Sequence, residues 1–292
     1  MEDFVNKNLI YKTLVGSKAY GIDTPESDTD VEGITIAPKE YYFGLKVFEQ
    51  QEIGKDCTIY AINKFVRLAR DNNPNILEML YTEPRHILFI NKYGEMLREN
   101  RGLFLSKKAK FSFSGYGFAQ LLRIKNHRKW IMFKEKEPIE EDFWVTKYRT
   151  MPDGTTKAYE KFQEQEYENA KKKWNQYLDW KKNRNPERAK LEEKYLVDTK
   201  HACHLFRLMT MCKEILTEGK VIVYRPDRDK LLEIRNGKWS YEKIVEEAEK
   251  LEKELDELYE KSTLQHRPND KAIDKLLIDI TEEALNEQAK TL

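Results

Sequence analysis

The chain has 292 residues, enough for one large domain or two small ones and for a substantial buried core. Its 52 basic and 51 acidic side chains nearly cancel, so no global field directs it to nucleic acid or membrane, and any nucleic-acid contact must come from a local patch. Three cysteines without a CxxC spacing exclude a zinc ribbon, and no apolar run of about 18 residues is present, so we expect a cytoplasmic protein without a membrane partner.

Short apolar runs separated by turns occupy the first hundred residues. The runs "LIYKTLV" (9–15) and "VEGITIAP" (31–38) read as strands. The residues Ile62, Phe65, Val66 and Ala69 then recur at helical spacing, and "NPNILEMLY" (73–81) opens with an Asn-Pro pair that is typical of a helix start. Strands and helices mixed over this length predict a small α/β unit.

From about residue 110 the pattern becomes helical. We expect a helix over 111–130 and helix again over 157–200, broken near Pro186, because that stretch has no glycine and no other proline. Residues 198–219 predict an amphipathic helix with Asp198 or Thr199 as its N-cap and Gly219 after its end. Residues 241–261 predict a charged, structural helix. The expected fold class is α+β, with a small mixed sheet followed by a mainly α-helical domain.

The stretch "LVGSKAYGIDTPESDTDVEGI" (14–34) carries the most chemical information. Asp28 and Asp30 lead into a β-branched run, and in a strand such residues face one side about 6.5 Å apart, which suits Mg²⁺ shared with substrate phosphates. Gly16 and Ser17 follow the first apolar run, where backbone can approach a phosphate and a helix opening at Ser17 directs its N–H groups to it. The pattern is neither a Walker loop nor GxGxxG. The competing interpretation is an Asx turn whose glycines serve only the turn.

This stretch resembles the signature of the DNA polymerase β nucleotidyltransferase superfamily, in which GS is followed by DxD. More narrowly, the chain resembles predicted bacterial and phage nucleotidyltransferases, some of them linked with RNA repair. The narrower likeness runs through "KFVRLARDNNPNILEMLY", "LLRIKNHRKW", "WKKNRNPERAKLEEKY" and "DTKHACHLFRLM". It implies a catalytic domain over residues 1–110 and a helical domain over residues 111–292 that completes the cleft for nucleotide and acceptor.

The resemblance also implies roles for single residues. Gly16 and Ser17 would contact the triphosphate, and Asp28 and Asp30 would hold two Mg²⁺ ions, with Mn²⁺ as an alternative. A third carboxylate would activate the acceptor, and Asp56, which enters the run "CTIYAI", is the best candidate. Weaker candidates are Glu32, Glu52 and Glu78. Without a third acid, metal binding would survive while proton removal failed, and the chain would be a binding module.

Basic residues of the helical half are expected to complete the nucleotide site. In "RIKNHRKW" the resemblance favours His127 and Lys129 at the cleft, while a solvated helix face with a core tryptophan stays open. Lys200, His204 and Arg207 share one helical face, which would either meet the triphosphate or form ion pairs. The expected nucleotide-binding set is Gly16, Ser17, Lys18, Tyr20, His127, Lys129, Lys200, His204 and Arg207.

The predicted function is Mg²⁺-dependent transfer of a nucleoside monophosphate from an NTP, ATP foremost, to an acceptor hydroxyl such as that of an RNA end. Two alternatives stay open: a non-catalytic nucleotide- or RNA-binding protein that keeps the fold, and an interaction scaffold built on the helical half. Neither the acceptor nor the oligomeric state can be read from the sequence.

Overall fold

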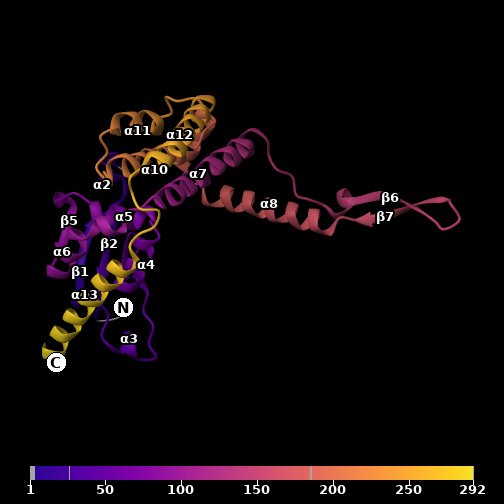
Figure 1. Ribbon diagram of the computed structural model, residues 1–292. Coiled ribbons are helices and arrows are strands. Elements are labelled where there is room, and N and C mark those ends of the chain that lie inside the picture. The colour runs from indigo at the N-terminus through magenta and orange to yellow at the C-terminus, as the bar shows by residue number, and fades with distance from the viewer. Residues whose placement is uncertain (1–3, 26, 185, 292) are drawn as a thin grey trace. The chain divides into compact units, whose positions relative to one another are not determined.

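The computed structural model describes residues 4–25, 27–184 and 186–291 (Figure 1). The chain divides into two compact units, and each is described by itself. The first unit comprises residues 1–121 and 200–292, and the second unit comprises residues 122–199. Helix α7 (Ala109–Met132) runs from the first into the second. The catalytic and helical domains expected on either side of residue 110 stay a prediction.

A five-stranded mixed sheet forms the centre of the first unit. Its strands are β1 (Leu9–Leu14), β2 (Val31–Thr35), β3 (Gln50–Glu52), β4 (Cys57–Ala61) and β5 (Ile87–Ile90). They lie in the order β3-β4-β2-β1-β5. Strands β2 and β4 run parallel, with Val31 opposite Cys57, and the other neighbours run antiparallel. Both strands expected in the opening stretch are therefore confirmed, and most of their β-branched residues are buried, namely Ile10, Thr13, Ile34 and Thr35.

Helices surround this sheet. They are α1 (Phe4–Lys7), α2 (Gly16–Tyr20), α3 (Glu40–Phe43), α4 (Ile62–Arg70), α5 (Pro74–Tyr81) and α6 (Lys92–Glu99), with 3₁₀ turns η1 (Pro84–His86) and η2 (Arg101–Phe104). Helix α4 buries Ile62, Phe65, Val66 and Ala69, as the spacing predicted. Helix α5 begins where expected, because the Asn73 side chain accepts hydrogen bonds from the first free N–H groups of the helix. The long helix α13 (Asp270–Thr291) packs on α4 and α6 (Figure 1).

The rest of the first unit is helical. It consists of the start of α7, α10 (Thr199–Glu218), α11 (Arg228–Arg235) and α12 (Tyr241–Lys261). Helix α10 forms its core, with Leu205, Phe206 and Met209 buried. Gly219 follows α10 in the left-handed conformation, with a φ of 64°, so the predicted helix end is confirmed. The fold class is therefore α+β, as expected. Among the described residues, no helix is both long and apolar enough to cross a membrane.

Aromatic packing holds the second unit together. Its elements are the end of α7, η3 (Glu140–Phe143), β6 (Trp144–Thr150), β7 (Thr156–Phe162), α8 (Glu164–Asn183) and α9 (Pro186–Tyr195). The Trp130 ring lies 5.9 Å from that of Tyr177 and 5.4 Å from that of Trp180, between ring centroids. Tyr177 is only 5% exposed. The aromatic spacing in α8 thus marks its buried face.

The helix expected over residues 157–200 is wrong at its N-terminal end. Residues 144–150 and 156–162 pair as an antiparallel hairpin, and α8 begins only at Glu164. The turn forms at Asp153 and Gly154, where Gly154 has a φ of 81° and the Asp153 carboxylate accepts from the Thr155 N–H and hydroxyl. The lack of glycine after residue 156 is compatible with either a helix or a strand. Residues 156–162 form a strand because they pair with residues 144–150.

Candidate active site

Two neighbouring parallel strands each begin directly after an aspartate. Asp30 precedes β2, and Asp56 precedes β4. The register places Val31 opposite Cys57, and the Val31 N–H donates to the Asp56 carbonyl at 2.8 Å. Because parallel strands start at the same edge of a sheet, the two aspartates lie side by side there.

Asp28 belongs to the same acidic cluster. Partial burial and the negative charges of Asp56 and Asp28 raise the pKa of Asp30 above its usual value, while Lys200 and Lys18 act in the opposite direction. Asp28 and Asp30 precede β2 instead of lying in it. We expected the alternation of side chains along a strand to point both carboxylates to the same side, and this explanation is wrong. The charges of Asp28 and Asp30 nevertheless interact.

Gly16 brings the backbone against the acidic cluster. It follows β1, and the Val15 N–H donates to the Asp30 carbonyl at 3.0 Å. Gly16 has a φ of 71°, and a Cβ atom there would lie 2.6 Å from Oδ2 of Asp30. Only glycine accommodates both the left-handed conformation and this approach. Helix α2 then carries Ser17, Lys18 and Tyr20, and the Lys18 ammonium donates to the Thr29 hydroxyl.

A cavity of about 220 Å³ opens at this edge of the sheet. Its lining comprises Val15, Gly16, Tyr20, Asp30, Val31, Glu32, Lys55, Asp56, Thr58, Asn75 and Glu78. Sequence reasoning did not single out Lys55, Thr58 or Asn75, because residues of these types carry no signal at isolated positions. The cavity thus gathers residues from α2, β2, β4 and α5 around the acidic cluster.

Glu32 lies in the wall of this cavity. Its burial, the nearby charge of Glu78 and that of Asp30 raise its pKa to about 7, although a hydrogen bond with Tyr60 acts in the opposite direction. Oε2 of Glu32 has no hydrogen-bond partner among the described residues. Glu32 therefore places a carboxyl group that is easily protonated beside Asp30 and Asp56.

Glu78 has both of its carboxylate oxygens occupied. The Tyr20 hydroxyl donates to Oε2 at 2.5 Å, and the Arg207 guanidinium donates to Oε1. Carbon Cζ of Arg207 lies 3.9 Å from the centroid of the Tyr20 ring, and its Nη2 lies 3.1 Å from Nδ1 of His204. With these contacts, Glu78 is held as the ion-pair partner of Arg207.

The three residues of α10 that were expected to meet a triphosphate differ in their exposure and in their contacts. Arg207 is 1% exposed; burial opposes its charge, but the charge of Glu78 raises its pKa. Lys200 is exposed and its charge reaches Asp30. His204 lies between the two in sequence and contacts Arg207. The nucleotide contacts expected of all three stay a prediction.

The loop after α10 and the end of α11 contact α2 and the residues that follow it. The Arg225 N–H donates to the Tyr20 carbonyl at 3.0 Å, and the Arg235 guanidinium donates to the Ile22 carbonyl at 2.5 Å. The Tyr224 ring lies against Gly21, where a Cβ atom would collide with it. These contacts, from a segment about two hundred residues further along the chain, hold α2 in position at the cavity.

His127 and Lys129 belong to the second unit. Nδ1 of His127 lies 2.9 Å from the Asp198 carboxylate, and the His127 ring stacks on Trp130. Lys129 is exposed and lies 3.3 Å from the Glu135 carboxylate. Trp130 packs with the other aromatic residues of that unit and is partly exposed. Nucleotide contact by His127 and Lys129 stays a prediction.

The mixed sheet, the Gly-Ser turn and the acids that lead two parallel strands define a nucleotidyltransferase-like protein of the DNA polymerase β type. Residues 1–279 match the RlaP family, described as the RNA repair pathway DNA polymerase beta family, and the chain belongs to that family. The description of the family connects its members with the DNA polymerase β family and with an RNA repair pathway.

Two curated relatives are similar over part of their length. An uncharacterized 38.9 kDa protein of the nrdC-mobD intergenic region of Enterobacteria phage T4 is 28% identical over 121 residues, which cover 37% of this chain and 36% of the relative. The uncharacterized protein YcgL of Bacillus subtilis is 27% identical over 168 residues, or 52% of this chain and 62% of the relative. The chain thus spans less than two thirds of either relative. No solved structure matches it significantly.

Proposed function

We propose that the protein transfers a nucleoside monophosphate from an NTP, ATP foremost, to a hydroxyl group at an RNA end. The observation that carries this proposal is the pairing of Asp30 and Asp56 at the start of two parallel strands, with the backbone of Gly16 against Asp30. Carboxylates that could bind metal and a backbone turn that could contact phosphate therefore line the same cavity.

The acidic cluster suits divalent ions such as Mg²⁺ or Mn²⁺. Asp28, Asp30 and Asp56 offer the hard oxygen atoms that Mg²⁺ prefers, and they are open enough to leave positions for substrate phosphates. Burial and then the charges of Asp56 and Asp28 raise the pKa of Asp30, and a bound cation would relieve the repulsion. Two ions held by these carboxylates would supply charge stabilisation to the attacking and leaving oxygens of an in-line displacement.

The remaining steps of the transfer reaction are assigned to individual residues of the chain. Asp56 accepts the proton of the acceptor hydroxyl, the acceptor oxygen bonds to the α-phosphorus, and the bond from the α-phosphorus to the bridging oxygen breaks to release pyrophosphate. Gly16, Ser17, Lys18 and Lys200 hold the triphosphate. Positioning and charge stabilisation dominate such chemistry, so small displacements of these groups are costly.

Other predicted residues act at the border of the cavity. Tyr20 presents its ring to the nucleotide, with Arg207 behind the ring and Glu78 on its hydroxyl. His204 contacts Arg207 and supports it. His127 and Lys129 of the second unit are proposed to contact nucleotide or acceptor.

The test is to incubate the protein with Mg²⁺, each of the four α-labelled NTPs and a single-stranded RNA, and to measure label joined to the RNA. Asp30→Asn and Asp56→Asn should each lower the rate by at least about 100-fold. Asp23→Asn is the matched control, since Asp23 is exposed and is absent from the cavity lining among the described residues. Equal labelling by wild type and both variants would overturn the proposal. NTP binding without any transfer would favour the non-catalytic alternative.

A further inference from the structure

The hairpin of β6 and β7 separates its side chains into two different faces. Residues paired across an antiparallel ribbon point to the same side, and successive residues alternate. One face takes its members from the pairs Val145–Lys161, Lys147–Tyr159 and Arg149–Lys157. We call these six residues the cationic face. It carries four cations, one aromatic ring and no carboxylate.

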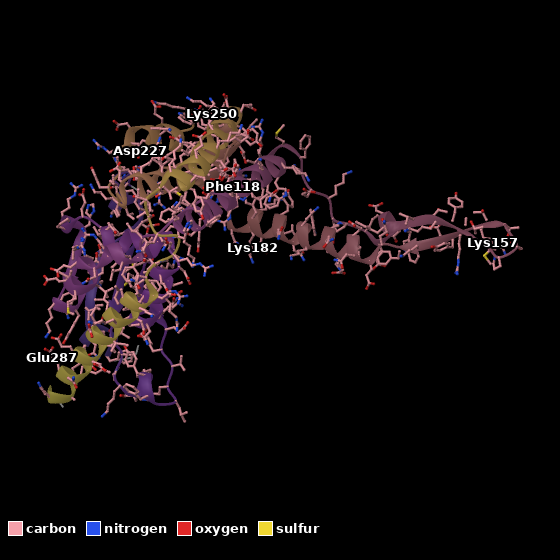
Figure 2. All side chains as sticks on the ribbon, in the orientation of Figure 1. Phe118, Lys157, Lys182, Asp227, Lys250 and Glu287 are labelled. Atoms are coloured by element: carbon pink, nitrogen blue, oxygen red, sulfur yellow. The ribbon has the colours of Figure 1, made fainter. Side chains whose placement is uncertain are left out.

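The cationic face is open to solvent. Lys147, Arg149, Lys157 and Lys161 are all exposed, and Tyr159 is 46% exposed. Figure 2 marks Lys157 on the hairpin, where side chains project from both strands. Among the residues that the structure describes, no carboxylate forms an ion pair with any of the four cations. They are therefore available to an outside anion.

Like charges stand directly opposite each other on this face. Arg149 pairs with Lys157 across the two strands, and such a pair destabilises an isolated ribbon. On β6 the two cations are two residues apart, or about 6.7 Å, whereas on β7 Lys157 and Lys161 are four residues apart with Tyr159 between them. Lysines do protect exposed strands from pairing with other chains, but that purpose does not require all of them on one face.

The opposite face has a different composition. It carries Trp144, Thr146, Tyr148 and Glu160, and the Thr146 hydroxyl donates to Glu160 at 2.8 Å. Phe162, on the same face, packs against Trp144 and against Tyr167 of α8, which secures the base of the hairpin. On this face Thr146 and Glu160 thus bind each other and Phe162 attaches the ribbon, whereas the part of the chain that the structure describes offers no carboxylate to the cationic face.

We infer that the cationic face binds single-stranded RNA, with phosphates on the four cations and a base stacked on Tyr159. A polyanion matches the rows of cations, and an exposed ring beside them suits a base with an accessible π face. The inference deepens the proposed function, on which it rests for the choice of RNA as the polyanion. In this proposal the acceptor RNA strand is bound by residues that lie far in sequence from the acidic cluster.

The test measures binding of a labelled single-stranded RNA of about ten nucleotides to the full chain by fluorescence anisotropy, without NTP. The variant with Lys147, Arg149, Lys157 and Lys161 all changed to Gln should bind at least about tenfold more weakly, and the slope of log affinity against log salt should fall by about 3. The control with Lys250, Lys253, Lys271 and Lys275 changed to Gln has the same net charge, and its affinity and slope should stay close to those of wild type. Circular dichroism checks that both variants fold.

Two tyrosines of the hairpin provide a second matched pair. Tyr159→Ala should weaken RNA binding about tenfold, because it removes the stacking ring from the cationic face. Tyr148→Ala removes an equally large ring that is 73% exposed on the opposite face, so it should leave affinity unchanged. Equal effects of the two substitutions would contradict the assignment of the face.

Four further results bear on the inference. Full RNA affinity in the four-Gln hairpin variant would overturn it, as would an equal loss in the charge-matched control. If polyglutamate of the same charge competes as well as RNA, the face is a general polyanion site and the RNA assignment is wrong. Asp30→Asn should bind RNA as wild type does, so failure of nucleotide transfer and failure of this inference are distinguishable.

Discussion

Glu78 of α5 and Arg207 of α10 form a buried ion pair although 129 positions separate them in the chain. The Tyr20 hydroxyl binds the same carboxylate, and the Arg207 guanidinium covers the Tyr20 ring. The cluster therefore joins the sheet-bearing part of the first unit to its helical part directly beneath the proposed nucleotide site. A buried pair of this kind is costly to break, because each partner would be left as an unpaired charge.

Removing Arg207 should destabilise the protein strongly. We expect Arg207→Met to lower the free energy of unfolding by about 3–5 kcal/mol, measured by urea denaturation. Arg67→Met is the control: Arg67 binds Glu49 at 2.6 Å on the surface, and its loss should cost less than about 1 kcal/mol. The double variant Glu78→Gln with Arg207→Met should be more stable than Arg207→Met alone. A cost of Arg207→Met no larger than that of Arg67→Met would contradict the structural role of the pair.

Glu32 should make stability depend on pH. Its pKa rises from 4.5 when unfolded to about 7 in the fold, so its contribution to stability is fully present below pH 4.5 and is lost as pH rises to about 7. The shift corresponds to roughly 3 kcal/mol. With a chelator present, Glu32→Gln should remove this loss and raise stability at pH 8. The exposed Glu52→Gln is the control, and an unchanged pH profile in Glu32→Gln would show that Glu32 does not titrate in this range.

Divalent ions should stabilise the fold through the acidic cluster. Mg²⁺ at about 100 times its dissociation constant should add about 2.7 kcal/mol, which is seen as a higher melting temperature. Asp30→Asn should abolish most of that increase, because it removes a ligand oxygen at the centre of the cluster. Without Mg²⁺ the same variant should melt no lower than wild type, since the raised pKa of Asp30 reflects unfavourable burial and repulsion. An equal Mg²⁺ response in both proteins would argue against metal at this site.

A side chain at Gly16 should disturb the acidic cluster in addition to straining the backbone. Gly16→Ala and Gly154→Ala both place alanine at a positive φ, 71° and 81°, and each should cost about 1–2 kcal/mol of stability. Only at Gly16 does the new Cβ meet a neighbour, the Asp30 carboxylate, whereas nothing lies within 4 Å at Gly154. Gly16→Ala alone should therefore weaken the Mg²⁺-induced rise in melting temperature. The opposite ranking of the two variants would count against the contact with Asp30.

Local patterns predicted much of the first unit. The runs that became β1 and β2, the apolar spacing of α4 and the Asn-Pro start of α5 are short-range signals, and each is confirmed. The hairpin over residues 144–162 escaped prediction, because a strand is recognised only with the segment that it pairs with. Asp56 was selected as an acid at the start of an apolar run, and β4 does begin directly after it.

The sequence by itself determined the family, the strands that flank the acidic stretch and the residues with the chemistry to bind metal and phosphate. Only the tertiary structure decided which of them meet. It set the parallel register that brings Asp56 to Asp30, the burial that raises the pKa of Glu32, and the pairing that turns Arg207 toward Glu78. Propensity and spacing act over a few neighbouring residues, whereas register, burial and ion pairing depend on segments that only the folded chain brings together.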